Sequence, residues 1–169
     1  EGVLIGSTAS FDSTRTPGQP GDWYGIRYLD TTTDTCVPPC SPSALQYCQI
    51  RHGVRGVTME NAAPDVTHCV IADCSSDGLS GTSGGIAKDR WDLSGNTITG
   101  NGGYGINLTS QTAVLMDRGT ISHNDLFGIN LNAKVSQRFV LNQLQSLRDQ
   151  RLICGLHGVG SCVLEDGRR

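Results

Sequence analysis

The sequence predicts an all-β fold, a right-handed parallel β-helix (a solenoid) of about six to seven coils stacked along one axis. Three observations predict it: two apolar anchors recur with nearly the same period, polar and apolar residues alternate around them, and the composition favours turns. The 169 residues include 22 glycines, while 5% are aromatic and 17% charged. This composition is typical of many short strands joined by tight turns, and the length suits one domain spanning residues 1–169.

The first anchor is a glycine followed by an apolar residue. It occurs at Gly25-Ile26, Gly56-Val57, Gly78-Leu79, Gly105-Ile106 and Gly128-Ile129. Subtraction of the glycine numbers gives spacings of 31, 22, 27 and 23 residues. The second anchor is a later apolar residue, with spacings of 21, 27, 23 and 23 residues. It occurs at Ile50, Ile71, Ile98, Ile121 and, more weakly, Leu144. Two anchors that share a period of about 22–23 residues indicate one coil per repeat.

Each coil is predicted to consist of strands because apolar and polar residues alternate at both anchors. Stacking then places apolar anchors on one another in continuous buried columns. Three residues after the second anchor come Cys74, Asn101 and Asn124. Asparagine tolerates a left-handed backbone and can hydrogen-bond its own chain, so we expect an asparagine ladder in this turn.

Insertions account for the longer spacings. Residues 31–42, which include Cys36 and three prolines, and residues 81–89 are expected to be loops that leave the coil register intact. Residues 145–169 are expected to form an irregular terminal coil.

The segments PGDWYGIR (residues 20–27) and LQYCQIR (residues 45–51) are similar to repeats of secreted bacterial β-helix proteins. The chain resembles the pectin-lyase-like β-helix superfamily over residues 18–144. This resemblance implies the fold and an extracellular or cell-surface location. It does not identify an activity, because the scaffold carries lyases, hydrolases, epimerases, adhesins and structural proteins.

The coil register extends to both ends of the sequence. Gly2 lies 23 residues before Gly25, and Asp166-Gly167 matches Asp77-Gly78. Neither end shows the polar cap that solenoids normally carry. Three interpretations remain open: a fragment of a longer protein, a subunit that stacks end to end into filaments, or an unrecognised cap within residues 146–162.

The seven cysteines favour an oxidising compartment. Local disulfides are expected within two pairs, Cys36 with Cys40 and Cys154 with Cys162. Cys48 and Cys69 occupy equivalent inward positions on neighbouring coils. Stacked strands place the Cα atoms of such residues about 4.8 Å apart, which suits either a disulfide or a ladder of buried thiols. Cys74 remains unpaired in this scheme.

No catalytic residues are predicted. In carbohydrate-active members of the superfamily, catalysis needs clustered carboxylates on the outer face of the first strand. The outward positions here carry Glu60 and Arg27 among uncharged residues, while Asp77 is assigned to another column. His52 and Asp73 share one column and form a weak candidate dyad. A zinc site is not expected, since no C-x2-C pair occurs and the four histidines are scattered. No cofactor is expected.

The outer face offers amide and hydroxyl groups beside aromatic rings, which can bind a polysaccharide or simply satisfy turns and strand pairing. The candidate ligand-binding residues are Tyr104, Phe127, Asn107 and Asn130. A net charge of −3 gives no reason to expect nucleic acid as a partner. No apolar run reaches the roughly 18 residues of a membrane helix, so no membrane insertion is expected.

The sequence therefore predicts an extracellular or cell-surface structural or interaction module, non-catalytic and self-associating end to end. The alternatives are a carbohydrate-binding adhesin module and a fragment of a polysaccharide lyase or hydrolase.

Overall fold

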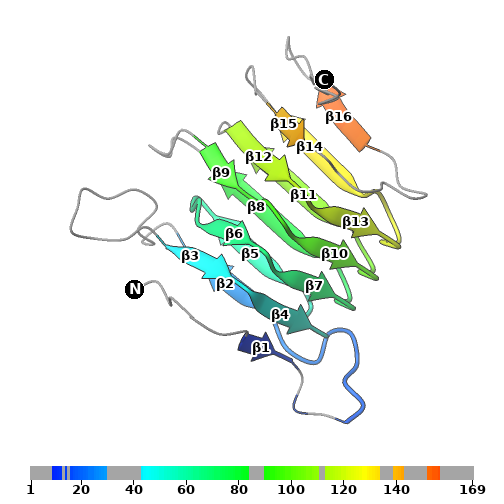
Figure 1. The fold of residues 1–169 in the computed structure, drawn as a ribbon. Helices are drawn as coiled ribbons and strands as arrows, with labels where there is room; N and C mark the ends of the chain where they lie inside the picture. The colour runs from blue at the N-terminus through cyan, green and yellow to red at the C-terminus, as the bar shows by residue number, and fades with distance from the viewer. Residues whose placement is uncertain are drawn as a thin grey trace, which may run out of the picture.

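The computed structural model describes residues 9–12, 14, 16–29, 43–83, 90–110, 113–133, 139–142 and 152–156. Within these residues the chain forms short strands joined by bends (Figure 1). The strands are β1 (Ala9–Phe11), β2 (Ile26–Tyr28), β3 (Ala44–Gln46), β4 (Cys48–Arg51), β5 (Val57–Glu60), β6 (Asp65–Thr67), β7 (Val70–Ala72), β8 (Leu79–Ser83), β9 (Arg90–Asp92), β10 (Thr97–Thr99), β11 (Ile106–Ser110), β12 (Ala113–Asp117), β13 (Thr120–Ser122), β14 (Ile129–Ala133), β15 (Phe139–Asn142) and β16 (Leu152–Leu156).

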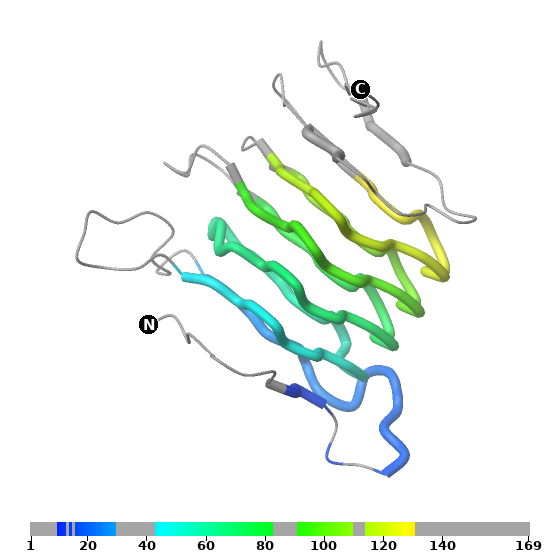
Figure 2. The backbone as a smooth tube through the Cα atoms, in the orientation of Figure 1, coloured from blue at the N-terminus to red at the C-terminus, as the bar shows by residue number. Residues whose placement is uncertain are grey.

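The strands make three walls, and every paired strand is parallel to its neighbour. The first wall has the order β16-β14-β11-β8-β5-β2, and the third wall has the order β1-β4-β7-β10-β13. The second wall consists of the sheets β3-β6 and β15-β12-β9. Each coil passes through the first, second and third walls in turn, and the tube in Figure 2 rises from coil to coil in sequence order. The expected all-β parallel β-helix is confirmed.

Four consecutive coils, β2–β4, β5–β7, β8–β10 and β11–β13, contain a strand of every wall. Further strands continue the stack on both sides. The last three of these coils make about three turns between Val57 and Ser122, fewer than the six to seven coils expected for the whole chain. Residues 31–42 lie outside the described residues. Strand β8 continues to Ser83, so the second insertion starts later than expected, and β16 adds a regular strand within residues 145–169.

Both predicted apolar columns lie inside the solenoid. Ile98 pairs with Ile71 on one side and with Ile121 on the other. The Gly-anchored column runs through Ile26, Val57, Leu79, Ile106 and Ile129. Ile98 is fully buried, and removing such a side chain from water contributes about 1.5–3 kcal/mol. Residues of all three walls pack together in this core.

The bends on either side of the third wall share a left-handed backbone. We call the residues before its strands the first bend: Tyr47, His68, Gly95 and Arg118. The residues after its strands form the second bend: His52, Asp73, Gly100 and His123. Their non-glycine members have φ between 52° and 58°, and the glycines have φ of 70° and 68°. Each non-glycine residue in this region costs roughly 1–2 kcal/mol, so the stacked coils must hold these bends in place.

The expected asparagine ladder is present, but its mechanism differs from the expectation. Asn101 donates from Nδ2 to Asn124 Oδ1 at 2.8 Å, and its Oδ1 accepts the Cys74 N–H at 3.1 Å. Asn101 and Asn124 follow the left-handed residues and do not adopt positive φ themselves. The prediction that asparagine takes the left-handed position was therefore wrong. Asparagine is favoured here because its amide can satisfy buried backbone groups of adjacent coils.

Candidate functional site

The outer face of the first wall carries rows of polar side chains in the predicted register. Thr58 pairs with Ser80, which pairs with Asn107, which in turn pairs with Asn130. A parallel row joins Glu60, Thr82 and Thr109. Since parallel strands lie about 4.8 Å apart, each row repeats a polar group once per strand.

A cavity of about 240 Å³ opens on this face. We call it the first-wall groove; its polar lining includes Arg55, Thr58, Glu60, Asp77, Ser80, Thr82, Asn107 and Thr109. The groove thus brings together Arg55 and two carboxylates, Glu60 and Asp77, that were expected in separate columns.

Glu60 is held by Arg27 at the edge of the groove. Arg27 donates from Nε to Glu60 Oε1 at 2.8 Å, and its Nη2 contacts the second carboxylate oxygen. The hydrogen bond from Arg27 lowers the pKa of Glu60, and the same contact raises the pKa of Arg27. Glu60 is therefore ionised at neutral pH, where it can accept hydrogen bonds but has no proton to donate.

Asp77 connects the candidate ligand residues. It is buried; its Oδ1 accepts the Tyr104 N–H at 3.0 Å, and its Oδ2 accepts Asn107 Nδ2 at 2.9 Å. Asn107 Oδ1 in turn accepts Asn130 Nδ2 at 3.0 Å. This role of Asp77 was not expected from the sequence. The available signal was that Asp77 precedes Gly78 as Tyr104 precedes Gly105, at a point where the chain enters the first wall.

The structure brings the four predicted ligand residues together in two pairs. The rings of Tyr104 and Phe127 stack with centroids 6.0 Å apart and an angle of 22° between their planes. Asn107 and Asn130 form the hydrogen-bonded pair described above. Because Asp77 binds both the Tyr104 backbone and the Asn107 amide, the two pairs share one support. The arrangement is a hydrogen-bonded polar surface that Asp77 links, through the Tyr104 backbone, to an aromatic pair.

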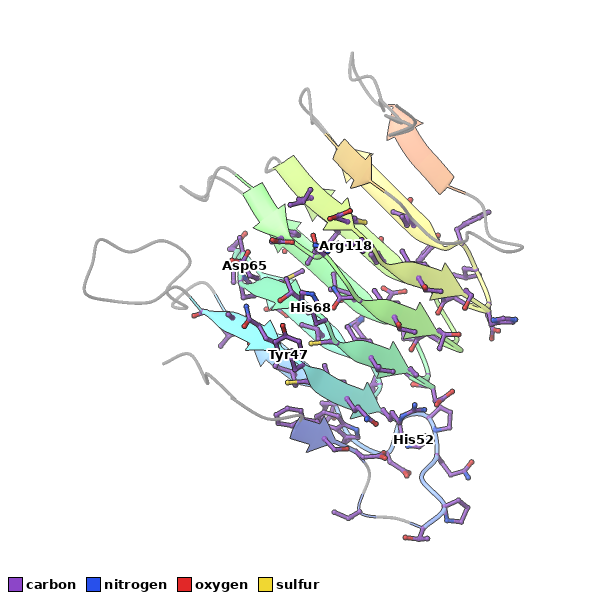
Figure 3. The ribbon with its side chains drawn as sticks, in the orientation of Figure 1. Tyr47, His52, Asp65, His68 and Arg118 are labelled. Carbon is purple, nitrogen blue, oxygen red and sulfur yellow. The ribbon has the colours of Figure 1, made fainter. Side chains whose placement is uncertain are left out.

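The weak candidate dyad has other partners. His52 Nδ1 lies 2.5 Å from Asp12 Oδ1, and Asp73 Oδ2 accepts Arg51 Nη1 at 2.7 Å. His52 lies on the bend that closes its coil, near β4 (Figure 3). These contacts tie β1 and β4 to neighbouring segments, which is a structural role.

Three cysteines of the described coils are buried thiols. Cys48, Cys69 and Cys74 are present as thiols, which for Cys48 and Cys69 corresponds to the ladder alternative. Burial raises the pKa of Cys69 to about 12 and that of Cys74 to about 11, so both stay protonated. The predicted pairs Cys36 with Cys40 and Cys154 with Cys162 stay predictions, because Cys36, Cys40 and Cys162 lie outside the described residues.

Among the described residues, no group of three or more His, Cys, Asp or Glu side chains could hold a metal ion. In the same part of the chain, no helix is long and apolar enough to cross a membrane.

Comparison with known proteins supports the fold. The family model described as a right-handed beta helix region matches residues 22–143. The chain belongs to this family. The match confirms the expected resemblance and gives the solenoid its right hand. No curated protein and no solved structure matches the chain.

Proposed function

We propose that this right-handed β-helix is an extracellular or cell-surface interaction module that binds an uncharged polysaccharide along the first-wall groove. The observation that carries the proposal is the connected series Asp77, Asn107 and Asn130, which fixes amide and carboxylate groups. Asp77 links this series through the Tyr104 backbone to the stacked rings of Tyr104 and Phe127. Saccharides are recognised by hydrogen bonds to their hydroxyls and by packing on aromatic side chains.

The charge of the groove favours an uncharged ligand. Its two carboxylates, Glu60 and Asp77, are balanced by Arg55 in the lining and by Arg27 on Glu60. An acidic polysaccharide would gain little from this balanced surface. A neutral one can exchange its hydroxyl–water hydrogen bonds for bonds to groups already held in position, which limits the ordering cost on binding.

The same contacts favour binding over glycoside cleavage. Hydrolysis by paired carboxyl groups requires one of them to be protonated as the general acid. Glu60 has a lowered pKa, and both oxygens of Asp77 accept hydrogen bonds. This pair is arranged to accept hydrogen bonds from hydroxyls.

The test is binding of soluble neutral polysaccharides, such as xylan, mixed-linkage β-glucan and galactomannan, beside polygalacturonate and alginate. Affinity electrophoresis and calorimetry of the whole chain should show binding to a neutral polymer. Asn107→Ala should weaken it about tenfold, since a fixed hydrogen-bonding pair is lost. Gln49→Ala, on the exposed face of the third wall, is the matched control and should bind normally.

Equal binding by the Asn107 variant and the wild type would overturn the proposal, as would preference for the acidic polymers. Release of reducing ends or unsaturated products from any of these polymers would favour the lyase or hydrolase alternative.

End-to-end association stays a prediction, because its register argument rests on residues 1–8 and 157–169, outside the described residues. Sedimentation velocity over a hundredfold range of concentration would test it.

A further inference from the structure

Two thiols face each other inside the solenoid at the first bend, between the second and third walls. Gln49 on β4 pairs with Val70 on β7, so the residues just before them, Cys48 and Cys69, are opposite each other on neighbouring coils (Figure 1). Stacked parallel strands place such Cα atoms about 4.8 Å apart, and a disulfide accepts separations of about 4.4 to 6.8 Å. The backbone therefore presents two thiols at a separation that one covalent bond can span.

The side chains of this pair gather on one side of the bend. The Cys48 thiol donates to the Gln46 carbonyl at 3.2 Å. The Cys69 thiol donates to the Thr67 carbonyl of its own coil at 3.2 Å, and its Sγ also lies 3.5 Å from the Leu45 carbonyl of the preceding coil. Gln46 and Thr67 are themselves partners in the register of β3 and β6. Both sulfur atoms thus lie beside the same bend on neighbouring coils, and Cys69 Sγ extends toward the coil of Cys48.

The pair is enclosed by the core. Cys48 and Cys69 are each 1% exposed. Tyr28, on β2 of the first wall, packs against the core cluster that contains both thiols. Burial raises the pKa of Tyr28 to about 12, and the two cysteines nearby add to the rise. The thiols are therefore out of reach of reagents in solution once the coils have closed.

The next coil is joined to its neighbour by an asparagine at the same inward position. Asn96 Oδ1 accepts the Cys69 N–H at 2.9 Å. Its Nδ2 donates to the carbonyls of Val66 and Leu93 at 2.7 and 2.8 Å. One coil earlier this position holds the Cys69 thiol, and a thiol is a weak hydrogen-bond acceptor. The junction between β4 and β7 thus carries two cysteines where the next junction has an asparagine.

We propose that Cys48 and Cys69 form an inter-coil disulfide in an oxidising compartment, so that the two buried thiols are the reduced form of a modification site. The oxidant is a low-molecular-weight disulfide, such as oxidised glutathione. The thiolate of one cysteine attacks a sulfur of this disulfide and expels one small thiolate. The thiolate of the other cysteine then attacks the protein sulfur of the mixed disulfide and expels the second. Two protein thiols are oxidised, the small disulfide is reduced to two thiols, and the two protons pass to the departing thiolates.

The bond is expected to form while the coils assemble, because the closed structure holds the Cys69 thiol protonated and both sulfurs buried. It joins two coils covalently and restricts the unfolded chain, which stabilises the fold. The bond is independent of the proposed function, since neither cysteine lines the first-wall groove.

The experiment is refolding of the whole chain from urea and reductant into a buffer with reduced and oxidised glutathione. The product is alkylated in denaturant, cleaved with trypsin and Asp-N, and mapped by mass spectrometry. Cleavage before Asp73 separates Cys69 from Cys74. The Cys69 peptide should be linked to the peptide that contains Cys48, and fragmentation should place the link at that residue.

The urea midpoint gives a second readout. Its fall on addition of reductant should be about 1 M smaller in Cys48→Ala than in the wild type, because the variant has no such bond to lose. Cys48→Ser, whose hydroxyl can still donate to the Gln46 carbonyl, is a second variant with the same expectation. Cys74→Ala is the matched control, since it also removes a buried thiol. It should keep both the linked peptide and the full effect of reductant.

Recovery of Cys69 as an alkylated thiol, or linked to a cysteine other than Cys48, would overturn the proposal. The mapping uses the wild-type chain, so this outcome counts even where a variant fails to fold. An equal effect of reductant on the wild type and on folded Cys48 variants would overturn it as well.

Discussion

The two bends that flank the third wall share a left-handed backbone. They differ in the buried residue that follows each left-handed position. The residue after each left-handed position points inward. Behind the first bend these residues are Cys48, Cys69, Asn96 and Gly119, and behind the second bend they are Gly53, Cys74, Asn101 and Asn124. Only the second bend has two successive asparagines, which bond to each other.

The comparison explains the buried cysteines. Cys48, Cys69 and Cys74 stand where asparagine stands in other coils, and each thiol donates to the carbonyl two residues earlier, at 3.2, 3.2 and 3.5 Å. A thiol fills the space and satisfies one carbonyl weakly. It cannot accept well from the adjacent coil as an asparagine oxygen does. Coils with asparagine at these positions are therefore held to their neighbours by stronger hydrogen bonds than coils with cysteine.

The largest effect is expected from Asn101→Ala. Asn101 is fully buried, and its loss leaves the Cys74 N–H and the Ile71 carbonyl without side-chain partners. The free energy of unfolding should fall by about 3 kcal/mol. Asn96→Ala should cost a similar amount, because its amide bonds Val66 O, Leu93 O and Cys69 N. Urea unfolding followed by circular dichroism measures both, and a loss under about 1 kcal/mol would contradict the ladder's importance.

The next prediction concerns the energetic coupling between asparagines, which is expected within the second bend and not between the two bends. Asn101 and Asn124 share a direct hydrogen bond of 2.8 Å, so the double alanine variant should be about 1 kcal/mol more stable than the sum of the single effects predicts. Asn96 and Asn101 lie at opposite ends of β10 and share no hydrogen bond among those of the described residues. Their effects should add. Additivity in both pairs would show that the asparagines act singly.

The periodic part of this architecture could be predicted from the sequence. Ile71, Ile98 and Ile121 recur because each fills the same position in stacked coils, and a repeated environment leaves a repeated residue. The polar rows of the first wall followed from the same register. Periodicity cannot show how far a side chain reaches, which is why Asp77 was assigned away from Asn107.

The first bend was missed for a different reason. Tyr47, His68, Gly95 and Arg118 recur at spacings of 21, 27 and 23 residues, as the isoleucine anchor does, but they have no chemistry in common. They share a positive φ, which the backbone of the bend imposes whatever the side chain is. Applying the period to every position, whatever its residue type, would have found this column.

A smaller effect is expected from Cys74→Asn, which should extend the ladder by one coil. Asn101 donates to the Ile71 carbonyl and accepts the Cys74 N–H of the preceding coil. At the equivalent position, the new asparagine would donate to the Ile50 carbonyl and accept the Gly53 N–H. Replacing a weak thiol contact with these bonds should stabilise the fold by about 1 kcal/mol. The matched control is Cys74→Ala, which loses the thiol and gains nothing. If Asn and Ala destabilise the protein equally, the ladder cannot extend to this coil.

The smallest effect concerns pH and the same thiol. Burial raises the pKa of Cys74 from 9.0 to about 11. The unfolded chain therefore loses this proton at lower pH than the folded one. The stability contributed by the buried thiol is complete below pH 9 and is lost as pH rises toward 11. Between pH 7 and pH 9.5, Cys74 should account for a loss of less than about 1 kcal/mol. The measurement is the difference in urea midpoint between wild type and Cys74→Ala at the two pH values. The alanine variant should show the shallower decline, whereas parallel declines would mean that the Cys74 thiol titrates alike in the folded and unfolded chains.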